Sequence, residues 1–302
     1  MVNGYRGFSN PPDYQSATIS VGQSRIPIKA ERGVRQGDSL SPLLFLLTLQ
    51  RALNQVNWEV GGIQIDDEKL TWLGYADDIV LFASNEDDLQ KLLNDVASKC
   101  ESVGLKMNAK KTKWLSTSTD PTPLIHQGQE IERVKDFIYL GRSISYRQPY
   151  STATPMNKEI SRRISAAWGA FNKVKRLMIS STVPLAVKRR YFNQCILPAF
   201  LYAAETWALS KADKDRLEVA QRRMERAMLG ITLRDKKTND WIRRKTELKD
   251  VVNCAHERKC KFAEKLEQHN GDRWTTRLTN WTPKTKRPVG RPPKRWKDDL
   301  QH

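Results

Sequence analysis

The chain has 302 residues, an apolar share of 39% and a formal net charge of +18 at pH 7, which allow two or three modest domains and favour a polyanionic partner. The longest apolar run, residues 43–49, is far shorter than the ~20 residues of a membrane span, and residues 1–22 are too polar for a signal peptide. Four scattered cysteines exclude a disulfide framework, so we expect an intracellular protein, nuclear or cytoplasmic, that does not contact a membrane.

Short strands and helices are mixed in residues 1–150. In chain order the patterns predict a hairpin (17–22 and 25–30), a helix (39–57), a second hairpin (70–74 and 79–83), a helix (86–103) and strands at 113–116 and 137–140. Asn85 is a good N-cap for the second helix, and Gly104 is suited to end it. This pattern predicts one α+β unit.

From residue 151 the apolar spacing changes to that of helices. The predicted helices are 157–179, 184–202, 211–229, 239–248 and 250–268. Pro184 suits a first helical turn, Ser210 an N-cap and Gly230 the position after a helix. The last part, 271–302, is basic and proline-rich, and we expect residues 282–295 to lack a fold of their own.

The positive charge is concentrated in the second half of the chain. Residues 1–157 contain 17 Lys and Arg against 18 Asp and Glu, whereas residues 158–302 contain 35 against 16. The net charges are therefore −1 and +19. This asymmetry predicts a nearly neutral domain followed by a region that binds nucleic acid.

Asp77 and Asp78 lie in the predicted turn of the second hairpin. A tight turn brings adjacent carboxylates together, and these are the hard oxygen donors that Mg²⁺ prefers in sites for nucleotidyl transfer. Adjacent aspartates also mark ordinary solvated turns. Three other pairs occur in this chain: Asp66-Asp67, Asp87-Asp88 and Asp298-Asp299. By itself the pair leaves both interpretations open.

Segments around this pair resemble, in the same order, motifs of reverse transcriptases. They are Arg32–Phe45 for motif B, Tyr75–Ala83 for motif C, Gly104–Lys113 for motif D and Phe137–Gly141 for the primer grip. Three segments of the second half resemble retrotransposons without long terminal repeats, of the RTE type: Ala203–Trp207, Arg226–Gly230 and Val289–Trp296. The resemblance extends over nearly the whole chain.

The resemblance implies three parts with different roles. Residues 1–150 would form a partial polymerase palm, an antiparallel sheet with helices, in an overall α+β fold. Residues 151–270 would form a mostly α-helical, thumb-like basic region, and residues 271–302 a disordered basic tail. The implied partners are an RNA template and a DNA primer, whose 3′-hydroxyl attacks a nucleoside triphosphate at a two-metal Mg²⁺ site. Asp77 would be the main metal ligand and Asp78 the second.

Motifs B and D also suggest contacts to nucleotide and template. The candidate residues are Arg35, Gln36, Gly37, Lys110 and Lys111. Glycine permits close approach of the backbone to a ligand, and the lysines would help to neutralise triphosphate charge. An ordinary junction between a loop and a helix, and a solvated basic turn, are the alternative interpretations.

The third carboxylate of a polymerase palm has no counterpart in this sequence. In the family it lies in motif A, upstream of motif B, in a segment that reads roughly Asp-x-x-Lys-Ala-Phe-Asp. Asp13 is the only acidic residue before Glu31, and it follows two prolines. The fingers and the endonuclease domain of such elements are not matched either. We therefore expect a C-terminal fragment that has little or no polymerase activity alone.

The basic half contains the candidate residues for nucleic-acid binding. They are Arg189, Arg190, Arg222, Arg223, Arg243, Arg244, Arg291, Lys294 and Arg295. Within 287–295, the Gly-Arg-Pro core could lie in a narrow minor groove. A nuclear-import signal and a flexible tail are equally compatible with that segment. The spacing of Cys254, His256, Cys260 and His269 does not fit a zinc finger.

Three hypotheses about function follow. The first is a fragment of an RNA-directed DNA polymerase from a retrotransposon. The second is a non-catalytic protein, derived from a retrotransposon, that binds RNA or DNA through its basic half. The third is a relic without a selected function. Active polymerase requires motif A, whereas nucleic-acid binding requires only the basic helices and tail.

Overall fold

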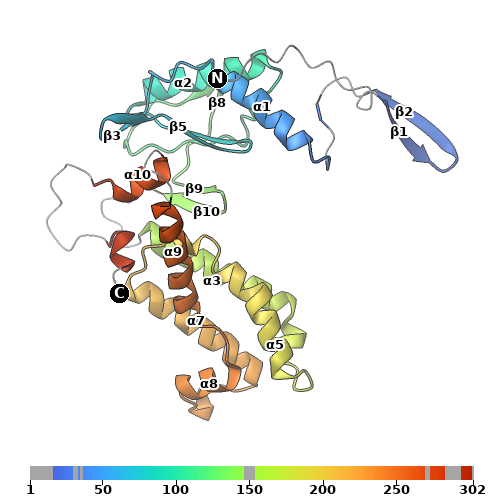
Figure 1. The fold of residues 1–302 in the computed structure, drawn as a ribbon, viewed down its shortest axis with the longest axis vertical. Helices are drawn as coiled ribbons and strands as arrows, with labels where there is room; N and C mark the ends of the chain where they lie inside the picture. The colour runs from blue at the N-terminus through green and yellow to red at the C-terminus, as the bar shows by residue number, and fades with distance from the viewer. Residues whose placement is uncertain are drawn as a thin grey trace. The chain divides into compact units, whose positions relative to one another are not determined.

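The structure is a computed structural model that describes residues 16–29, 33–34, 37–145, 154–268, 273–282 and 294–300. The chain divides into two compact units, Met1–Arg133 and Val134–His302. The first combines hairpins with two helices, and the second is mostly helical (Figure 1). The predicted α+β class is confirmed. Among the described residues, no helix combines the length and apolar character needed to cross a membrane.

The first unit contains four antiparallel hairpins and two helices in its described part. In chain order these are β1 (Ser16–Val21), β2 (Ser24–Lys29), α1 (Ser41–Leu53), β3 (Ile63–Ile65), β4 (Glu68–Leu70), β5 (Trp72–Tyr75), β6 (Asp78–Leu81), α2 (Glu86–Ser102), β7 (Ile125–His126) and β8 (Gln129–Glu130). Each strand pairs with its neighbour in sequence, so the sheets among the described residues of this unit have two strands each. The hairpins predicted at 17–30 and 70–83 are confirmed, whereas β3–β4 and β7–β8 were not predicted.

Helices α1 and α2 pack against each other through the first core. Leu49 and Leu53 of α1 are buried together with Leu92 and Val96 of α2. Helix α1 ends earlier than the predicted residue 57, because the indole N–H of Trp58 donates to the Leu53 carbonyl at 2.9 Å and covers the last turn. Helix α2 begins as predicted.

The cap of α2 has the expected geometry. The Asn85 side chain accepts a hydrogen bond from the Asp88 N–H at 2.8 Å, and Gly104 adopts a positive φ of 84° after the last turn. A strand was also predicted at 113–116. That prediction is wrong, because Trp114 forms only an isolated bridge with Arg133 and donates from its indole to the Ile131 carbonyl.

The second unit contains one hairpin followed by helices in its described part. Its elements are β9 (Asp136–Tyr139), β10 (Arg142–Ser145), α3 (Pro155–Lys173), α4 (Lys175–Ile179), α5 (Leu185–Tyr191), η2 (Phe192–Ile196), α6 (Leu197–Phe200), η3 (Ala204–Thr206), α7 (Lys211–Leu229), η4 (Leu233–Asp235), α8 (Asn239–Thr246), α9 (Val251–Glu267), α10 (Trp274–Asn280) and η5 (Lys297–Asp299). They enclose a large apolar core that includes Phe171, Phe192, Phe200 and Trp207. Helix α7 has the predicted bounds, with a Ser210 capping box at its start.

Two helices predicted as continuous are interrupted. The helix predicted at 157–179 is divided at Val174 into α3 and α4. The second is divided into α5, the π-helical segment η2 and α6, because Pro198 lacks the N–H that would bond to Gln194. The Leu197 N–H instead donates to the Phe192 carbonyl, five residues earlier.

Hairpin β9–β10 is attached to the second unit rather than to the first. Its turn carbonyls accept hydrogen bonds from Arg162 and Arg163 at Gly141, and from the Tyr202 hydroxyl at Leu140. The Ser143 N–H also donates to buried Glu159 at 3.0 Å. These bonds explain why the units divide between residues 133 and 134, whereas we expected a boundary near residue 150.

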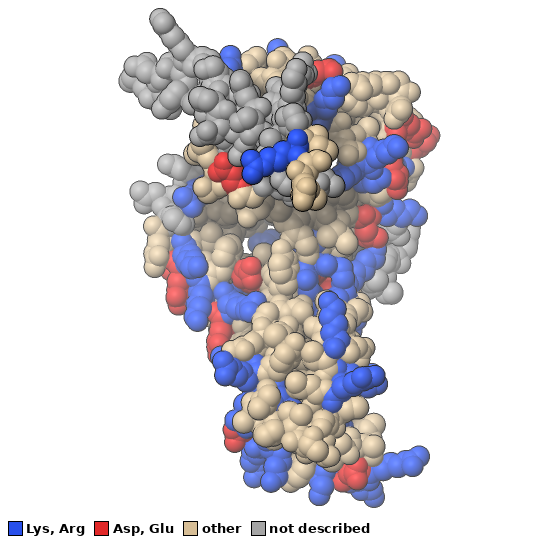
Figure 2. Space-filling view, turned by 90° about the vertical axis from the view of Figure 1, so that its right-hand side faces the viewer, with Lys and Arg blue, Asp and Glu red and all other residues tan. Residues whose placement is uncertain are grey.

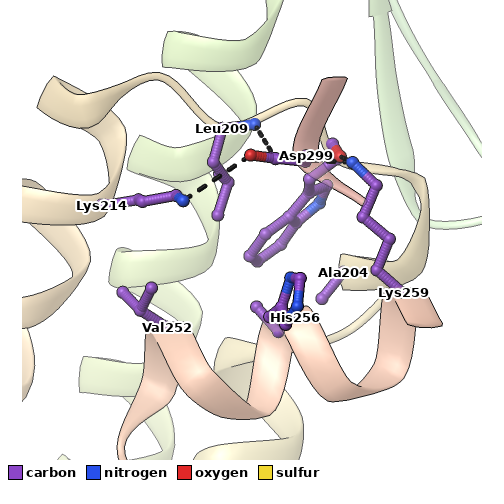
Figure 3. A pocket seen from close by; sticks show the side chains of 9 residues that line it. Ala204, Leu209, Lys214, Val252, His256, Lys259 and Asp299 are labelled. Atoms are coloured by element: carbon purple, nitrogen blue, oxygen red, sulfur yellow. Dashed lines mark hydrogen bonds and ion pairs between the residues drawn. The ribbon is translucent and has the colours of Figure 1, made fainter. Parts of the chain in front are cut away.

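Parts of the C-terminal segment fold onto the second unit. The buried Asp299 carboxylate accepts a hydrogen bond from the Leu209 N–H at 3.0 Å and pairs with Lys259 at 3.4 Å and Lys214 at 3.6 Å (Figure 3). The indole of Trp296 donates to the Glu205 carbonyl at 2.7 Å. The prediction of a disordered tail over 271–302 is therefore wrong for residues 273–282 and 294–300. Residues 283–293 lie outside the described residues.

Candidate active site and basic surface

Asp77 and Asp78 lie at the tip of hairpin β5–β6. Tyr75 of β5 pairs with Asp78 of β6, which leaves Ala76 and Asp77 as the two turn residues. Ala76 has a φ of 53°, a left-handed conformation that is uncommon for a residue with a side chain. Both aspartates are exposed. The turn thus presents two adjacent carboxylates to solvent.

The hairpin is anchored in the first core behind these carboxylates. Ile79 and Leu81 of β6 pack against the core, as does Trp72 of β5, whose ring stacks on Trp58 with centroids 5.1 Å apart. The Phe82 N–H donates to the Thr71 carbonyl at 2.8 Å and extends the pairing beyond the strands. The apolar strands therefore fix the position of the acidic turn within the first unit.

Hairpin β3–β4 has a similar turn that serves as an internal comparison. Ile65 pairs with Glu68, so Asp66 and Asp67 are the two turn residues, and Asp66 has a φ of 51°. This pair of adjacent aspartates, which resembles no catalytic motif, thus also lies in a hairpin turn. Since both turns carry exposed aspartates, local geometry does not distinguish a metal site from a solvated turn.

The carboxylates at Asp77 and Asp78 fit a metal ion only in part. Their oxygens have the hard character that Mg²⁺ prefers, but a two-metal site needs more donors than two side chains supply. Among the described residues, no group of three or more His, Cys, Asp and Glu side chains could hold a metal ion. The fit is therefore incomplete, and we derive no catalytic step from it.

The motif B residues are described only in part. Gly37 has a φ of 92°, in the region that favours glycine, and a Cβ at this position would meet no atom within 4 Å. The conformation, rather than crowding, accounts for this glycine. Arg35 and Gln36 lie outside the described residues.

The motif D lysines lie in an exposed turn. Lys111 donates its backbone N–H to the Asn108 carbonyl at 3.1 Å, and the side chains of Lys110 and Lys111 are exposed. In contrast, Lys113 forms an ion pair with Glu132. The turn leaves Lys110 and Lys111 accessible to an anion.

One predicted contact residue, Arg222, belongs to the interior of the second unit. It is 3% exposed, forms an ion pair with fully buried Glu225 and pairs with Asp250 at 2.9 Å. Burial raises the pKa of Glu225 above its ordinary value, although the Arg222 charge reduces this shift. The prediction that Arg222 contacts nucleic acid is therefore wrong, since an arginine held between two carboxylates inside the fold cannot reach a phosphate.

Arg189 and Arg243 are partly occupied by internal contacts. Arg189 pairs with Glu247 at 2.5 Å and donates to the Thr246 carbonyl at 2.8 Å. Arg243 lies 3.3 Å from Asp250. These contacts join α5 to the C-terminal end of α8, and α8 to the N-cap of α9.

In the adjacent pairs 189–190, 222–223 and 243–244, the second arginine is not held by internal ion pairs among the described residues. Arg190, Arg223 and Arg244 are exposed, and none of them forms an ion pair within the described part of the chain. Adjacent residues of a helix point in directions about 100° apart, so only one of two neighbouring arginines can face the interior. The second members are therefore the accessible ones.

The C-terminal candidates have mixed environments. Lys294 pairs with Asp299, and Arg295 donates to the Thr282 hydroxyl at 3.3 Å. Arg291 lies outside the described residues. Lys294 thus belongs to the contacts that hold the C-terminal segment, whereas Arg295 is exposed.

The cysteine and histidine residues of α9 do not converge on a metal site. Cys254 is buried in the core, where burial raises the pKa of its thiol. The Cys260 sulfur lies 3.5 Å from the His256 imidazole, one helical turn away. His269 lies outside the described residues. Within the part of the chain that the structure describes, these side chains offer no set of three ligands.

The cavity beside Asp299 is too small for a substrate. It is lined by His256, Lys259, Lys214 and Asp299 among others, and its volume is about 20 Å³ (Figure 3). That volume holds roughly one water molecule. The cavity is therefore a packing defect beside the docked C-terminal segment.

Lys237 and Trp241 form, together with Lys245, a basic and aromatic group that the sequence patterns did not identify as a unit. Trp241 and Lys245 lie four residues apart on one face of α8, and Lys237 lies just before the N-cap Thr238, four residues before Trp241. The signal that could have identified them is the recurrence of basic and aromatic residues at helical spacing. The net charge of residues 158–302 does not distinguish this group from the other basic residues of the second half.

Comparisons with known proteins agree with the sequence motifs. Residues 4–144 match the family model described as reverse transcriptase (RNA-dependent DNA polymerase). Over 249 residues the chain is 34% identical to a transposon-derived protein of Caenorhabditis elegans; the match covers 79% of this chain and 87% of that protein.

Two further relatives are much longer than this chain. The "Probable RNA-directed DNA polymerase from transposon BS" of Drosophila melanogaster is 26% identical over 260 residues, which are 81% of this chain and 27% of that protein. A retrovirus-related Pol polyprotein from the type-2 retrotransposable element R2DM of the same species is 42% identical over 80 residues, 26% of this chain and 8% of the polyprotein. The chain thus corresponds to a minor part of these two polymerases.

Proposed function

The chain belongs to the reverse transcriptase family and carries a reverse transcriptase domain of retrotransposon origin, and we propose that it derives from an element without long terminal repeats, of the RTE type. The exposed Asp77-Asp78 turn supports the reverse transcriptase part of this proposal, because it lies inside the matched residues 4–144 and its sequence resembles motif C. The RTE part rests on the resemblance of Ala203–Trp207, Arg226–Gly230 and Val289–Trp296. Under this proposal, residues 1–150 represent part of the palm, 151–270 a thumb-like region and 271–302 a basic C-terminal segment.

Reverse transcriptases generally use divalent metal ions, and we propose that Mg²⁺ is the ion suited to Asp77 and Asp78. When bound, such ions activate the primer hydroxyl and stabilise charge on the triphosphate. Asp77 would be the main ligand and Asp78 the second. Removing one ligand from a preorganised two-metal site is expected to cost orders of magnitude in rate. The polypeptide of 302 residues should therefore have little or no polymerase activity alone.

Residues of motifs B and D would contact the nucleotide and the template. Arg35 and Gln36 precede Gly37, whose left-handed φ allows the backbone to approach a ligand closely. Lys110 and Lys111 are exposed on a turn and could balance part of a triphosphate charge. The proposed partners are an RNA template and a DNA primer.

The second unit would bind nucleic acid through the outer faces of its helices. Arg190, Arg223 and Arg244 are exposed and have no ion pair among the described residues. Phosphates attract such side chains, and the released counterions make the affinity fall steeply with salt. Arg189 and Arg243 are partly available, and Arg295 and Arg291 would extend the surface.

A primer-extension assay with Mg²⁺ or Mn²⁺ tests the catalytic part. The expected result is no detectable extension by the 302-residue polypeptide and by its Asp77→Asn variant alike. Asp67→Asn is the matched control, because Asp67 lies in the similar turn of β3–β4. Robust synthesis that disappears in Asp77→Asn and persists in Asp67→Asn would show that the two carboxylates suffice, and it would overturn the proposal of an inactive chain.

A non-catalytic nucleic-acid-binding protein is the second candidate function. The exposed side chains of Arg190, Arg223 and Arg244 favour it, since phosphate binding by arginine requires no metal and no third carboxylate. In that case Asp77→Asn should leave oligonucleotide affinity unchanged, while the affinity should fall as the salt concentration rises. Affinity that is independent of salt would contradict it.

A further inference from the structure

Helix α8 carries an aromatic ring between two lysines. The Thr238 hydroxyl caps the helix by accepting a hydrogen bond from the backbone N–H of Trp241 at 3.2 Å. The ammonium groups of Lys237 and Lys245 lie 5.2 Å and 5.9 Å from the centre of the Trp241 ring. These three residues define what we call the α8 surface. Trp241 and Lys245 lie four residues apart on one side of the helix, and Lys237, just before the N-cap, lies near the same ring.

The orientation of this surface is fixed by the opposite side of α8. Ile242 and Thr246 are fully buried, and Arg189 of α5 donates to the Thr246 carbonyl at 2.8 Å. Lys237 and Lys245 are exposed, and Trp241 is half-buried. Since one side of the helix is packed into the fold, the lysines and the ring are held toward solvent.

Excess positive charge surrounds this ring. The exposed bases Arg234, Lys236 and Arg244 lie in the same segment, and Lys and Arg side chains gather over the end of the second unit formed by α8 (Figure 2). Within the described residues, Lys237 and Lys245 form no ion pair with a carboxylate.

The acidic residues of the segment are fewer and two of them have other partners. The Asp235 carboxylate accepts hydrogen bonds from the N–H and hydroxyl of Thr232, and Glu247 pairs with Arg189. Asp240 lies in the first turn of α8, where the helix dipole favours a negative charge. The surface around the ring therefore keeps a net positive charge.

We propose that the α8 surface binds single-stranded nucleic acid, with Lys237 and Lys245 on successive phosphates and one base against the Trp241 ring. This inference rests on the proposed nucleic-acid binding of the second unit and locates that binding at the α8 surface. Basic side chains alone would attract any polyanion, but a ring between two cations also offers a stacking partner. Bases in a duplex are already stacked on one another, so only a single strand can present a free base face.

Fluorescence anisotropy of labelled oligonucleotides with the full chain tests this inference. Stacking of a base on an aromatic side chain contributes about 1–3 kcal/mol, so Trp241→Ala should weaken single-strand binding about 5- to 150-fold. Trp241→Phe should retain most of the affinity, because the smaller ring still stacks. Affinity for a duplex of the same length should change little in either variant. Parallel measurements with RNA and with DNA oligonucleotides show which kind of single strand is bound more tightly.

Charge variants keep the test decisive if Trp241→Ala fails to fold, which thermal unfolding followed by circular dichroism would reveal. The double variant Lys237→Gln/Lys245→Gln should weaken binding and reduce its salt dependence. The matched control is Lys173→Gln/Lys175→Gln, which removes the same charge from exposed lysines of α3 and α4. Equal losses in the two double variants would overturn the α8 assignment.

The outcomes also separate this inference from the proposed function. Binding that persists unchanged in folded Trp241→Ala would overturn the α8 surface while leaving nucleic-acid binding of the second unit intact. Equal weakening of single-strand and duplex binding would show a basic patch without base stacking, and would likewise overturn it. Absence of binding to every oligonucleotide would refute both.

Discussion

The inner and outer faces of the helices in the second unit use their arginines differently. On the inner face, Arg222 is held between Glu225 and Asp250, and it stabilises the fold. On the outer face, its neighbour Arg223 is exposed and has no ion pair among the described residues. Two identical residues, adjacent in sequence, thus have different roles. The net charge of a region therefore overstates the charge that is available to a partner.

A similar contrast exists between two turns of the first unit. Asp66-Asp67 and Ala76-Asp77 both occupy two-residue hairpin turns with a left-handed first residue. Only the second turn lies within a segment that resembles a motif of reverse transcriptases, and it is followed by the carboxylate of Asp78. The surrounding sequence, and not the turn itself, supports a catalytic origin.

Replacement of the inner arginine should have the largest effect on stability. Arg222→Leu leaves the buried Glu225 carboxylate without its cation, which should lower the free energy of unfolding by about 3–5 kcal/mol. Arg223→Leu, the adjacent control, should change it by no more than about 0.5 kcal/mol. Urea unfolding monitored by circular dichroism compares the two. Equal effects of both substitutions would contradict the division into inner and outer faces.

Asp299 extends the comparison to a buried carboxylate with a predictable pH dependence. Burial alone raises its pKa, but the hydrogen bonds from Lys294 and Leu209, with the charges of Lys259 and Lys214, lower it below the ordinary value overall. A lowered carboxyl pKa stabilises the fold above the unfolded pKa of about 3.9, and this stabilisation is lost as the pH falls through the folded value.

Asp299→Asn should therefore destabilise the second unit at neutral pH by about 1.5–3 kcal/mol, the range for hydrogen bonds to charged groups. The difference from the unmodified chain should begin to shrink below about pH 4, where the carboxyl group becomes protonated in the unfolded chain, and it should be lost once the pH falls below the lowered pKa of the folded chain. Thermal unfolding over a range of pH measures this. A difference that stays constant down to pH 2 would contradict the assigned role of the carboxylate.

The attachment of hairpin β9–β10 should show the smallest effect. A Cβ at Gly141 would lie 2.8 Å from the Tyr202 ring, whereas a Cβ at Gly230 would meet nothing within 4 Å, and both glycines have a positive φ. Gly141→Ala should therefore destabilise the second unit by about 1 kcal/mol more than Gly230→Ala, since only the first adds a steric clash to the backbone strain. Equal losses would mean that the Tyr202 ring moves away without cost.

Elements with local signals were predictable from sequence. The bounds of α7 follow from Ser210, Gly230 and the helical spacing between them, and hairpin β5–β6 follows from apolar runs on both sides of a polar turn. The strands of β3–β4 are only three residues long, too short for a recognisable alternation. Local signals thus identified the acidic turn but not every neighbour of it.

Features that depend on distant partners were not predictable. Asp299 bonds to Leu209, 90 residues earlier, and Arg222 bonds to Asp250, so neither the docked C-terminal segment nor the buried arginine is visible in a local pattern. The break of the helix at 192–196 differs, because it follows from Pro198, a local signal that was not taken into account in predicting a continuous helix at 184–202. The motif resemblance predicted the candidate site. The contacts in the structure distinguish arginines that stabilise the fold, such as Arg222, from exposed ones, such as Arg223.

The salt dependence of oligonucleotide binding tests most directly whether the outer faces bind nucleic acid. The triple variant Arg190→Gln/Arg223→Gln/Arg244→Gln removes only exposed charges, so it should fold normally. If each arginine contacts one phosphate, the slope of log affinity against log salt should become shallower by about 0.7 per lost contact for a single strand. A folded triple variant whose affinity and salt slope equal those of the unmodified chain would contradict the account.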